Sequence, residues 1–310
     1  MALIAFIFPG QGSQSVGMGK ALVDAFPEAR QTFEEADVAF GGPLSRLCFE
    51  GPESQLTLTE NTQPAILTVS IAAYRVLASR GMTPALVAGH SLGEYSANVA
   101  AGTFGFGDAV GIVRRRGRYM QEAVPVGQGA MAAILGLDPA LVQQACDEAA
   151  QGEVVSPANI NSRDQVVIAG AAGAVQRASE RARALGAKRA IPLSVSAPFH
   201  CALMKPAEDR LAPELRALAV SIPRVPVVAN VDAEPNRDPA AAIEALVRQV
   251  SAPVLWEAVV HRLASEGVTT YVEVGPGRVL SGLVKKIHRD ATVYPFGALE
   301  DLEPILARRK

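Results

Sequence analysis

The pentapeptide GHSLG at residues 89–93 has the residue types and spacing of a nucleophile elbow. Such a G-x-S-x-G sequence holds its serine on a sharp turn between a strand and a helix, where the hydroxyl can meet a substrate. A short apolar run, Leu86–Ala88, precedes it, and a helical pattern over Leu92–Ala101 follows it. Ser91 is therefore the candidate nucleophile, although a plain tight turn would also suit the pentapeptide.

A serine nucleophile needs a base, and the four histidines differ in how well they could serve. His90 is adjacent in sequence, so its ring should point away from Ser91 across the turn. His261 and His288 lie in helical stretches among Arg and Lys, which indicates solvent-exposed faces. His200 lies in the loop SAPFHC, beyond the last strand of a predicted small domain, and is placed to face a cleft between domains. A capping or packed histidine is the alternative.

A hydrolase triad built on such an elbow would also contain an acid between the serine and the histidine. The acids between Ser91 and His200 mostly fall in helical stretches or at their starts, and Asp164 falls in a predicted hairpin turn. No acid stands out as a third member, so another group, such as a backbone carbonyl, would orient His200.

Two backbone N–H groups are candidates for stabilising an oxyanion. Leu92 follows the serine at a helix N-terminus, where free N–H groups favour negative charge. The loop FPGQGSQ at residues 8–14 follows the first predicted strand and offers the N–H of Gln11. This loop is no dinucleotide-binding motif, because Ser15 stands where the third glycine belongs, and it does not match a Walker A loop. A plain turn is the alternative.

The stretch DAVGIVRRRGRYMQEA at residues 108–123 carries four arginines, and one of them is placed differently. At about 100° per residue, Arg116 falls inside the apolar half of the helix and the other three fall outside it. A buried guanidinium needs an anionic partner or several acceptors, and its fork suits a carboxylate. Arg116 is therefore a candidate for binding a substrate carboxylate near Ser91; the alternative is an arginine that snorkels to solvent or pairs with a local acid.

The composition limits the class of protein that carries these residues. The chain has 310 residues, of which 49% are hydrophobic and 19% charged, so it can bury a sizeable core. The net charge of -2 gives no sign of a nucleic-acid-binding surface, and no apolar run approaches the roughly 20 residues that span a bilayer. Three cysteines without a C-x-x-C pair suit a reducing cytoplasm, and the histidine spacing argues against zinc. We expect a cytoplasmic protein with no metal, whose apolar N-terminus is a core strand rather than a signal peptide.

Short apolar runs alternate with helical patterns, which is typical of an α/β protein with a largely parallel sheet. Strands are predicted at Leu3–Phe8, Leu86–Ala88, Val227–Ala229, Tyr271–Val274 and, more weakly, Val293–Pro295. The main helices are predicted at Gln63–Ser79, Leu92–Ala101, Asp108–Ala123, Pro239–Val250 and Leu255–Glu266.

The middle of the chain follows a different pattern, strand–helix–strand–strand–helix–strand, which predicts a ferredoxin-like split motif. Its elements are predicted at Ala130–Leu137, Pro139–Ala150, Val154–Ile160, Gln165–Ala169, Gly173–Leu185 and Arg189–Val195. We predict that residues 125–196 form a small domain inserted into a large one that comprises residues 1–124 and 197–310. A cleft between two such domains is a natural ligand site.

With these motifs assembled, the chain resembles the malonyl-CoA:acyl carrier protein transacylases, the acyltransferases that prime fatty acid synthesis. The resemblance runs nearly end to end and rests on six segments: FPGQGSQ at 8–14, NTQPA at 61–65, GHSLGEYSA at 89–97, RRRGRYMQEAVP at 114–125, APFHCALMKPA at 197–207 and VEVGPG at 272–277. It implies a large α/β-hydrolase-like domain with a mainly parallel sheet and a ferredoxin-like insertion.

The resemblance also implies a role for each candidate. Ser91 would form a malonyl ester, His200 would be its base, and Arg116 would pair with the malonyl carboxylate. The N–H groups of Gln11 and Leu92 would form the oxyanion hole.

Four further positions match the family pattern. Gln249 would orient the histidine through its main-chain carbonyl, so that no acid is needed. Gln63 and Asn159 would lie near the active site. Phe199, a bulky residue before the histidine, would crowd an α-methyl branch and so favour malonyl groups.

The reaction implied is transfer from malonyl-CoA to the phosphopantetheine thiol of acyl carrier protein, with ping-pong kinetics. We expect a monomer with no permanently bound cofactor and with no nucleic-acid or membrane partner. A thioesterase that uses the same serine and a non-catalytic acyl-CoA or carrier-protein binding module are the alternatives. Candidates for a basic carrier-protein docking surface are Arg114, Arg115, Arg118, Lys285, Lys286 and Arg289.

Overall fold

The large part of the molecule is organised around a six-stranded sheet with the strand order β10-β9-β1-β2-β7-β8. Its strands are β1 (Leu3–Phe8), β2 (Leu86–Gly89), β7 (Val227–Val228), β8 (Pro235–Asn236), β9 (Val268–Val274) and β10 (Thr292–Phe296). The computed structural model describes residues 3–195 and 197–307. Within these residues, β7 with β8 is the one antiparallel pair of this sheet. The mainly parallel sheet confirms the predicted α/β class.

Side chains of β1 alternate between two helical layers. Phe6 and Phe8 point into one core, and Ala5 and Ile7 point into the other. A strand covered on both faces needs such a continuous apolar run, because successive side chains point in opposite directions. The first core takes residues from α1 (Lys20–Ala25), α2 (Pro27–Phe40), α3 (Leu44–Glu50), α4 (Glu53–Leu56), α5 (Thr59–Ser79), α6 (Leu92–Ala101), α7 (Phe106–Glu122), α10 (Lys205–Arg216), α11 (Pro239–Gln249) and α14 (Leu302–Ala307). The second takes residues from α12 (Trp256–Ser265) and α13 (Val279–Ile287).

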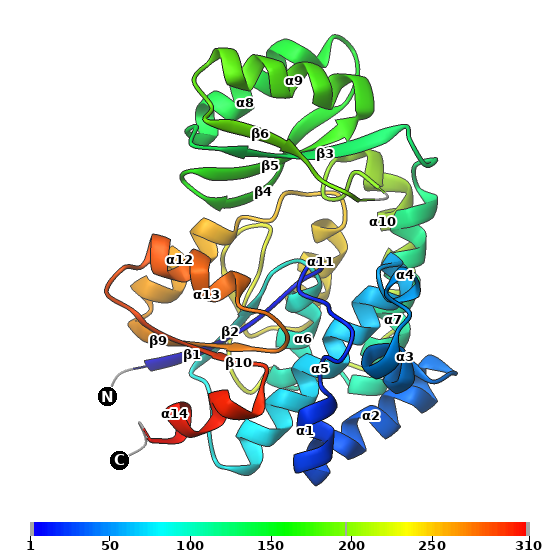
Figure 1. Ribbon diagram of the computed structural model, residues 1–310, viewed down its shortest axis with the longest axis vertical. Helices are drawn as coiled ribbons and strands as arrows, with labels where there is room; N and C mark the ends of the chain where they lie inside the picture. The colour runs from blue at the N-terminus through cyan, green and yellow to red at the C-terminus, as the bar shows by residue number, and fades with distance from the viewer. Residues whose placement is uncertain (1–2, 196, 308–310) are drawn as a thin grey trace.

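A four-stranded antiparallel sheet with the order β4-β5-β3-β6 forms the small part. Its elements are β3 (Gly129–Leu135), α8 (Pro139–Ala150), β4 (Val155–Ser162), β5 (Gln165–Ala171), α9 (Ala172–Ala184) and β6 (Arg189–Pro192). Figure 1 shows the small part stacked on the large one, with α8 and α9 on the side of the sheet that faces away from it. The strand order is that of the predicted ferredoxin-like motif. The ends of the small domain at residues 125 and 196 stay a prediction, and residue 196 lies outside the described residues.

Three predicted elements differ from the structure by three or more residues at one end, and one of them is β9, which begins at Val268 rather than Tyr271. The last strand of the small part ends at Pro192 rather than Val195, because the chain turns there: the Val195 N–H donates to the Leu193 carbonyl (2.9 Å). Helix α5 begins one turn before the predicted start and takes Pro64 into its interior. In the part of the chain that is described, no helix is long and apolar enough to cross a bilayer.

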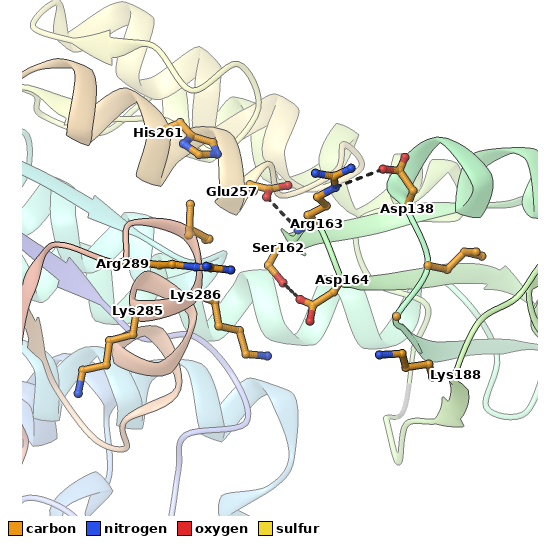
Figure 2. A pocket seen from close by; sticks show the side chains of 13 residues that line it. Asp138, Ser162, Arg163, Asp164, Lys188, Glu257, His261, Lys285, Lys286 and Arg289 are labelled. Carbon is orange, nitrogen blue, oxygen red and sulfur yellow. Dashed lines mark hydrogen bonds and ion pairs between the residues drawn. The ribbon is translucent and has the colours of Figure 1, made fainter.

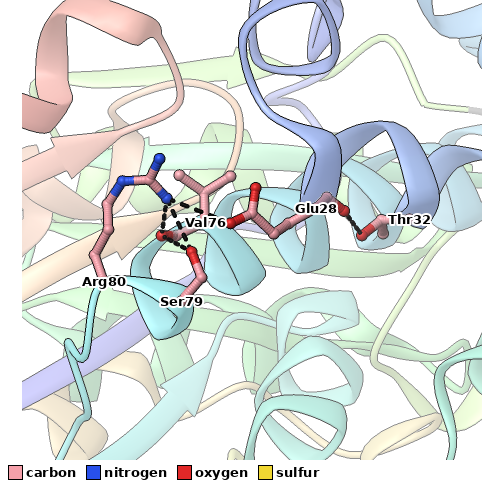
Figure 3. Close-up of polar contacts among 5 residues, drawn as sticks. All are labelled: Glu28, Thr32, Val76, Ser79 and Arg80. Carbon is pink, nitrogen blue, oxygen red and sulfur yellow. Dashed lines mark hydrogen bonds and ion pairs between the residues drawn. The ribbon is translucent and has the colours of Figure 1, made fainter.

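A polar contact joins the C-terminal end of α5 to α2 (Figure 3). The Arg80 Nη1 donates to the Val76 carbonyl (2.7 Å) and lies 3.8 Å from a carboxylate oxygen of Glu28. A hydrogen bond from Ser79, with the charge of Arg80, holds the pKa of Glu28 below its usual value. Such solvent-accessible pairs contribute little free energy, so packing of the apolar faces is what joins these helices.

Candidate active site

Ser91 occupies a strained turn between β2 and α6. Its backbone has φ 51° and ψ -110°, in a region where a residue with a Cβ rarely lies. Two glycines permit the turn: a Cβ on Gly89 would lie 1.9 Å from the backbone of Gly93, and a Cβ on Gly93 would lie 2.0 Å from the Phe8 carbonyl oxygen. The pentapeptide therefore forms the predicted strand–turn–helix.

Asn230, which the sequence analysis missed, fixes this turn from the end of β7. Its Oδ1 accepts a hydrogen bond from the Ser91 N–H (2.7 Å), and its Nδ2 donates to the Gly89 carbonyl (2.7 Å). Strained backbone persists only where its surroundings over-determine it. A buried amide that bonds both sides of the serine meets this need.

His200 lies against the serine. Its Nε2 is 2.7 Å from the Ser91 Oγ, and its Nδ1 is 2.9 Å from the main-chain carbonyl oxygen of Gln249, at the end of α11. A carbonyl only accepts, so Nδ1 carries the proton and Nε2 is free to accept the hydroxyl proton. The geometry thus contains the carbonyl, rather than an acid, that the sequence analysis expected beside the histidine.

His200 is held neutral by its surroundings. Burial, followed by the charge of Arg116, lowers the pKa of His200 to about 3. At neutral pH the ring therefore carries no charge and can act as a proton acceptor.

Arg116 projects from α7 into the same site and is buried, with 1% of its surface exposed. Its Nη1 donates to the Gln63 Oε1 (2.8 Å), and its Nη2 donates to the Ser91 Oγ (3.1 Å) and to the Gln249 Oε1 (2.9 Å). Within residues 3–195 and 197–307, no carboxylate forms an ion pair with it, and its Nε has no acceptor. A buried guanidinium surrounded by neutral acceptors beside a serine hydroxyl is placed to bind an incoming carboxylate.

The two predicted oxyanion donors lie beside the serine. Gln11 and Leu92 both line the cavity that contains Ser91, and Leu92 is the first residue of α6. In the described part of the chain, neither N–H has a hydrogen-bond acceptor. Both N–H groups are thus free to bind an oxygen from a ligand.

The cavity has a volume of about 370 Å³ and lies between the two parts of the molecule. Met131 and Asn159 line it from the small part, and Gln63 and Phe199 line it from the large part. A cleft of this size, with polar side chains converging on the Ser91 hydroxyl, has the character of a small-molecule site.

The other histidines have other partners. The His90 Nε2 bonds the Asn161 Oδ1 (2.9 Å), so the ring points away from Ser91 as predicted. His261 is exposed. The expectation for His288 was wrong: it is half-buried and bonds the Tyr271 hydroxyl (3.0 Å), because it ends α13 against the sheet.

Comparisons with known proteins place the chain in a family. A family model described as an acyl transferase domain matches residues 5–296. A malonyl CoA-acyl carrier protein transacylase from Salmonella typhimurium is 54% identical over 288 residues, which are 93% of each chain. The chain belongs to the malonyl-CoA–acyl carrier protein transacylase family. The Bacillus subtilis transacylase is 52% identical over 304 residues, covering 98% of this chain and 96% of the relative.

Solved structures of transacylases have the same fold. An acyl carrier protein S-malonyltransferase from Vibrio cholerae has a TM-score of 0.96 and 47% identity, covering 98% of this chain and 100% of its own. The malonyl-transacylase solved in complex with its type II PKS acyl-carrier protein gives a TM-score of 0.97 at 48% identity, covering 99% of this chain and 100% of the matched one. The fold and the acyltransferase class of this chain are therefore established.

A second, larger cleft of this transacylase has about 900 Å³ and lies between the β4–β5 turn and the helices α12 and α13. Figure 2 shows Lys188 and Lys286 reaching toward its middle from opposite sides. Its ionisable lining residues are Asp138, Arg163, Asp164, Lys188, Glu257, His261, Lys285, Lys286 and Arg289. It contains neither Ser91 nor His200, and among the described residues no group of three or more His, Cys, Asp and Glu could hold a metal.

Proposed function

We propose that this transacylase moves the malonyl group of malonyl-CoA to the phosphopantetheine thiol of acyl carrier protein through a malonyl ester on Ser91, and so supplies malonyl carrier protein for fatty acid biosynthesis. One observation carries the proposal. The Arg116 Nη2 lies 3.1 Å from the Ser91 Oγ, so that a carboxylate binder and a nucleophile meet in one site. An acyl group with a free carboxylate fits this pair. The compartment, which we predict to be the cytoplasm, stays a prediction.

In the first half-reaction, the Ser91 Oγ attacks the thioester carbon while His200 takes the hydroxyl proton. The N–H groups of Gln11 and Leu92 bind the oxyanion that forms. The C–S bond then breaks, and the CoA sulfur leaves with the proton from His200. In the second half, the phosphopantetheine thiol gives its proton to His200 and attacks the ester, and the serine oxygen recovers the proton. No permanently bound cofactor enters this scheme, and one copy of the chain supplies every group.

The remaining pocket residues define which acyl group fits. Gln63 holds Arg116 by accepting from its Nη1 (2.8 Å). Phe199 is nearly buried at the cavity wall, where it would crowd a branch on the α-carbon. Asn159 lines the same cavity from β4 and offers an amide to the bound substrate.

The experiment that tests this function uses the whole enzyme with malonyl-CoA and then holo-acyl carrier protein, followed by intact mass spectrometry. We expect malonyl-CoA alone to add one malonyl group to the enzyme, and the carrier protein to remove it and appear as its malonyl thioester. Free malonate as the main product would instead indicate a thioesterase. Binding without any covalent adduct would indicate a binding module.

The carrier protein docks over the larger cleft. The side chains of Lys188, Lys285, Lys286 and Arg289 form no ion pair among the described residues. The arginines of α7 are engaged instead: Arg115 pairs with Glu214, Arg118 with Glu122, and Arg114 bonds the Phe40 carbonyl. The cleft has more basic side chains than acidic ones, because Arg163 and these four outnumber Asp138, Asp164 and Glu257. This excess of positive charge favours an acidic partner, the charge that the family resemblance gives to the carrier protein.

Reversing two of these charges, with Lys285→Glu/Lys286→Glu, is expected to raise KM for the carrier protein about tenfold, because rim charges act on association. Formation of the malonyl-enzyme from malonyl-CoA should be unchanged. Lys20→Glu/Arg30→Glu makes the same change of charge on α1 and α2, at the far end of the large part (Figure 1), and is the matched control. Equal rises of KM in both double variants would show that the net charge of the enzyme, rather than this cleft, determines carrier-protein binding.

A further inference from the structure

Glu94 is a buried carboxyl group to which the proposed mechanism gives no role. It is the third residue of α6, has 1% of its surface exposed, and forms no ion pair among the described residues. Its Oε2 accepts hydrogen bonds from the Asn230 N–H (3.0 Å) and the Gln249 Nε2 (2.8 Å). Burial of a carboxyl group is costly, and it raises the pKa of Glu94 to about 7. A carboxyl group buried at such a cost needs an explanation in the groups that it binds.

Both partners of Glu94 hold parts of the active site. Asn230 bonds the two sides of the strained serine turn, through the Ser91 N–H and the Gly89 carbonyl. Gln249 holds His200 through its main-chain carbonyl and Arg116 through its side-chain Oε1. Glu94 thus lies one hydrogen bond away from the groups that position the nucleophile, the base and the guanidinium.

The side-chain amide of Gln249 can work in only one orientation. Its Nε2 must donate to Glu94 and to the Ser91 carbonyl (3.0 Å), so that its Oε1 faces the Arg116 Nη2 (2.9 Å). In the reversed orientation, two donors would face each other at the guanidinium. The Oε2 of Glu94 accepts from Gln249 and Asn230 in the ionised group and equally when the proton is on Oε1, so it favours the working orientation over the reversed one.

We infer that Glu94 is a positioning residue which, through the side-chain amide of Gln249, fixes the aim of Arg116 and hence the preference of this enzyme for acyl groups that carry a carboxylate. The inference rests on the proposed function. Glu94 would then determine specificity although it touches neither the substrate nor the Ser91 hydroxyl.

The test compares kcat/KM for malonyl-CoA and acetyl-CoA in Glu94→Leu and Glu94→Gln. In Glu94→Leu we expect the malonyl-to-acetyl ratio to fall about 10- to 100-fold, the effect of losing one hydrogen bond to a charged group. In Glu94→Gln, an amide oxygen can accept both hydrogen bonds, and the ratio should stay within about threefold of wild type. General damage to the fold would lower both activities of Glu94→Leu alike and leave the ratio unchanged, which would overturn the inference.

A double-mutant cycle tests whether Glu94 acts through the side-chain amide of Gln249. It remains informative if Glu94→Leu is poorly stable. Gln249→Leu keeps the main-chain carbonyl for His200 and removes only the side-chain amide. If Glu94 acts through that amide, Glu94→Gln and Glu94→Leu should have the same malonyl-to-acetyl ratio in the Gln249→Leu background. A lower malonyl-to-acetyl ratio for Glu94→Leu than for Glu94→Gln in that background would overturn the inference. If the wild-type enzyme formed no malonyl adduct at all, the proposed function would fail instead, so the two failures are distinguishable.

Discussion

Ser91→Ala is expected to abolish malonyl-enzyme formation and to lower kcat for transfer by at least ~10⁴-fold, the scale on which the loss of a nucleophile acts. The hydroxyl is the only group that can form the ester at this position, and His200 has no other proton to accept there. Malonyl-CoA should still bind, because Arg116 and the two oxyanion N–H groups are untouched. Intact mass after mixing with malonyl-CoA, together with calorimetric binding, separates these effects.

Two controls make this result specific. Alanine keeps the Cβ that serine already places at φ 51°, so the unfolding temperature should change little. Ser91→Cys keeps a nucleophile of another kind and should form a malonyl thioester on the enzyme. A malonyl adduct on the Ser91→Ala protein would assign the ester to another residue and refute the mechanism.

The sequence predicted those parts of the site that depend on local pattern. The turn at 89–93 needs only its own glycines and the flanking strand and helix, and the apolar face of α7 identified Arg116 as buried. The mainly parallel sheet and the split motif of the small part follow from the order of apolar runs. Each element follows from a pattern within its own few residues, and the order of the elements along the chain indicates the fold.

Glu94 and Asn230 lay outside the reach of such patterns. An acidic residue in the first turn of a helix is ordinary, because it suits the helix dipole at the surface. What makes Glu94 unusual is its burial against residues 136 and 155 positions away. The Gln249 side chain likewise meets Arg116 across 133 positions. Only the assembled fold brings these polar groups together, and one sequence carries no local sign of it.

Arg116→Ala is expected to lower kcat/KM for malonyl-CoA by about 10²- to 10³-fold, because a buried charge pair with the substrate carboxylate is lost. Acetyl-CoA has no carboxylate, so its kcat/KM should fall far less or rise. Arg116→Lys keeps the charge but not the two-pronged fork of the guanidinium. Its kcat/KM for malonyl-CoA should therefore lie between the values of wild type and Arg116→Ala. Steady-state kinetics with both donors measures the effect. Equal losses for the two donors would mean that Arg116 serves only to hold Gln63 and Gln249 in place.

The same variant also changes the acid side of the pH profile, which gives a readout independent of selectivity. Burial first, and the charge of Arg116 second, lower the pKa of His200 to about 3, so the wild-type base stays neutral, and kcat/KM keeps its value, down to low pH. Removing the arginine removes one of these causes and leaves burial, so the pKa of His200 rises toward its ordinary value of about 6.5. Since the protonated ring cannot accept the serine proton, the fall of kcat/KM for acetyl-CoA should begin at a higher pH in Arg116→Ala than in wild type. An unshifted profile would show that the guanidinium does not act on His200, and its role would then be confined to the substrate carboxylate.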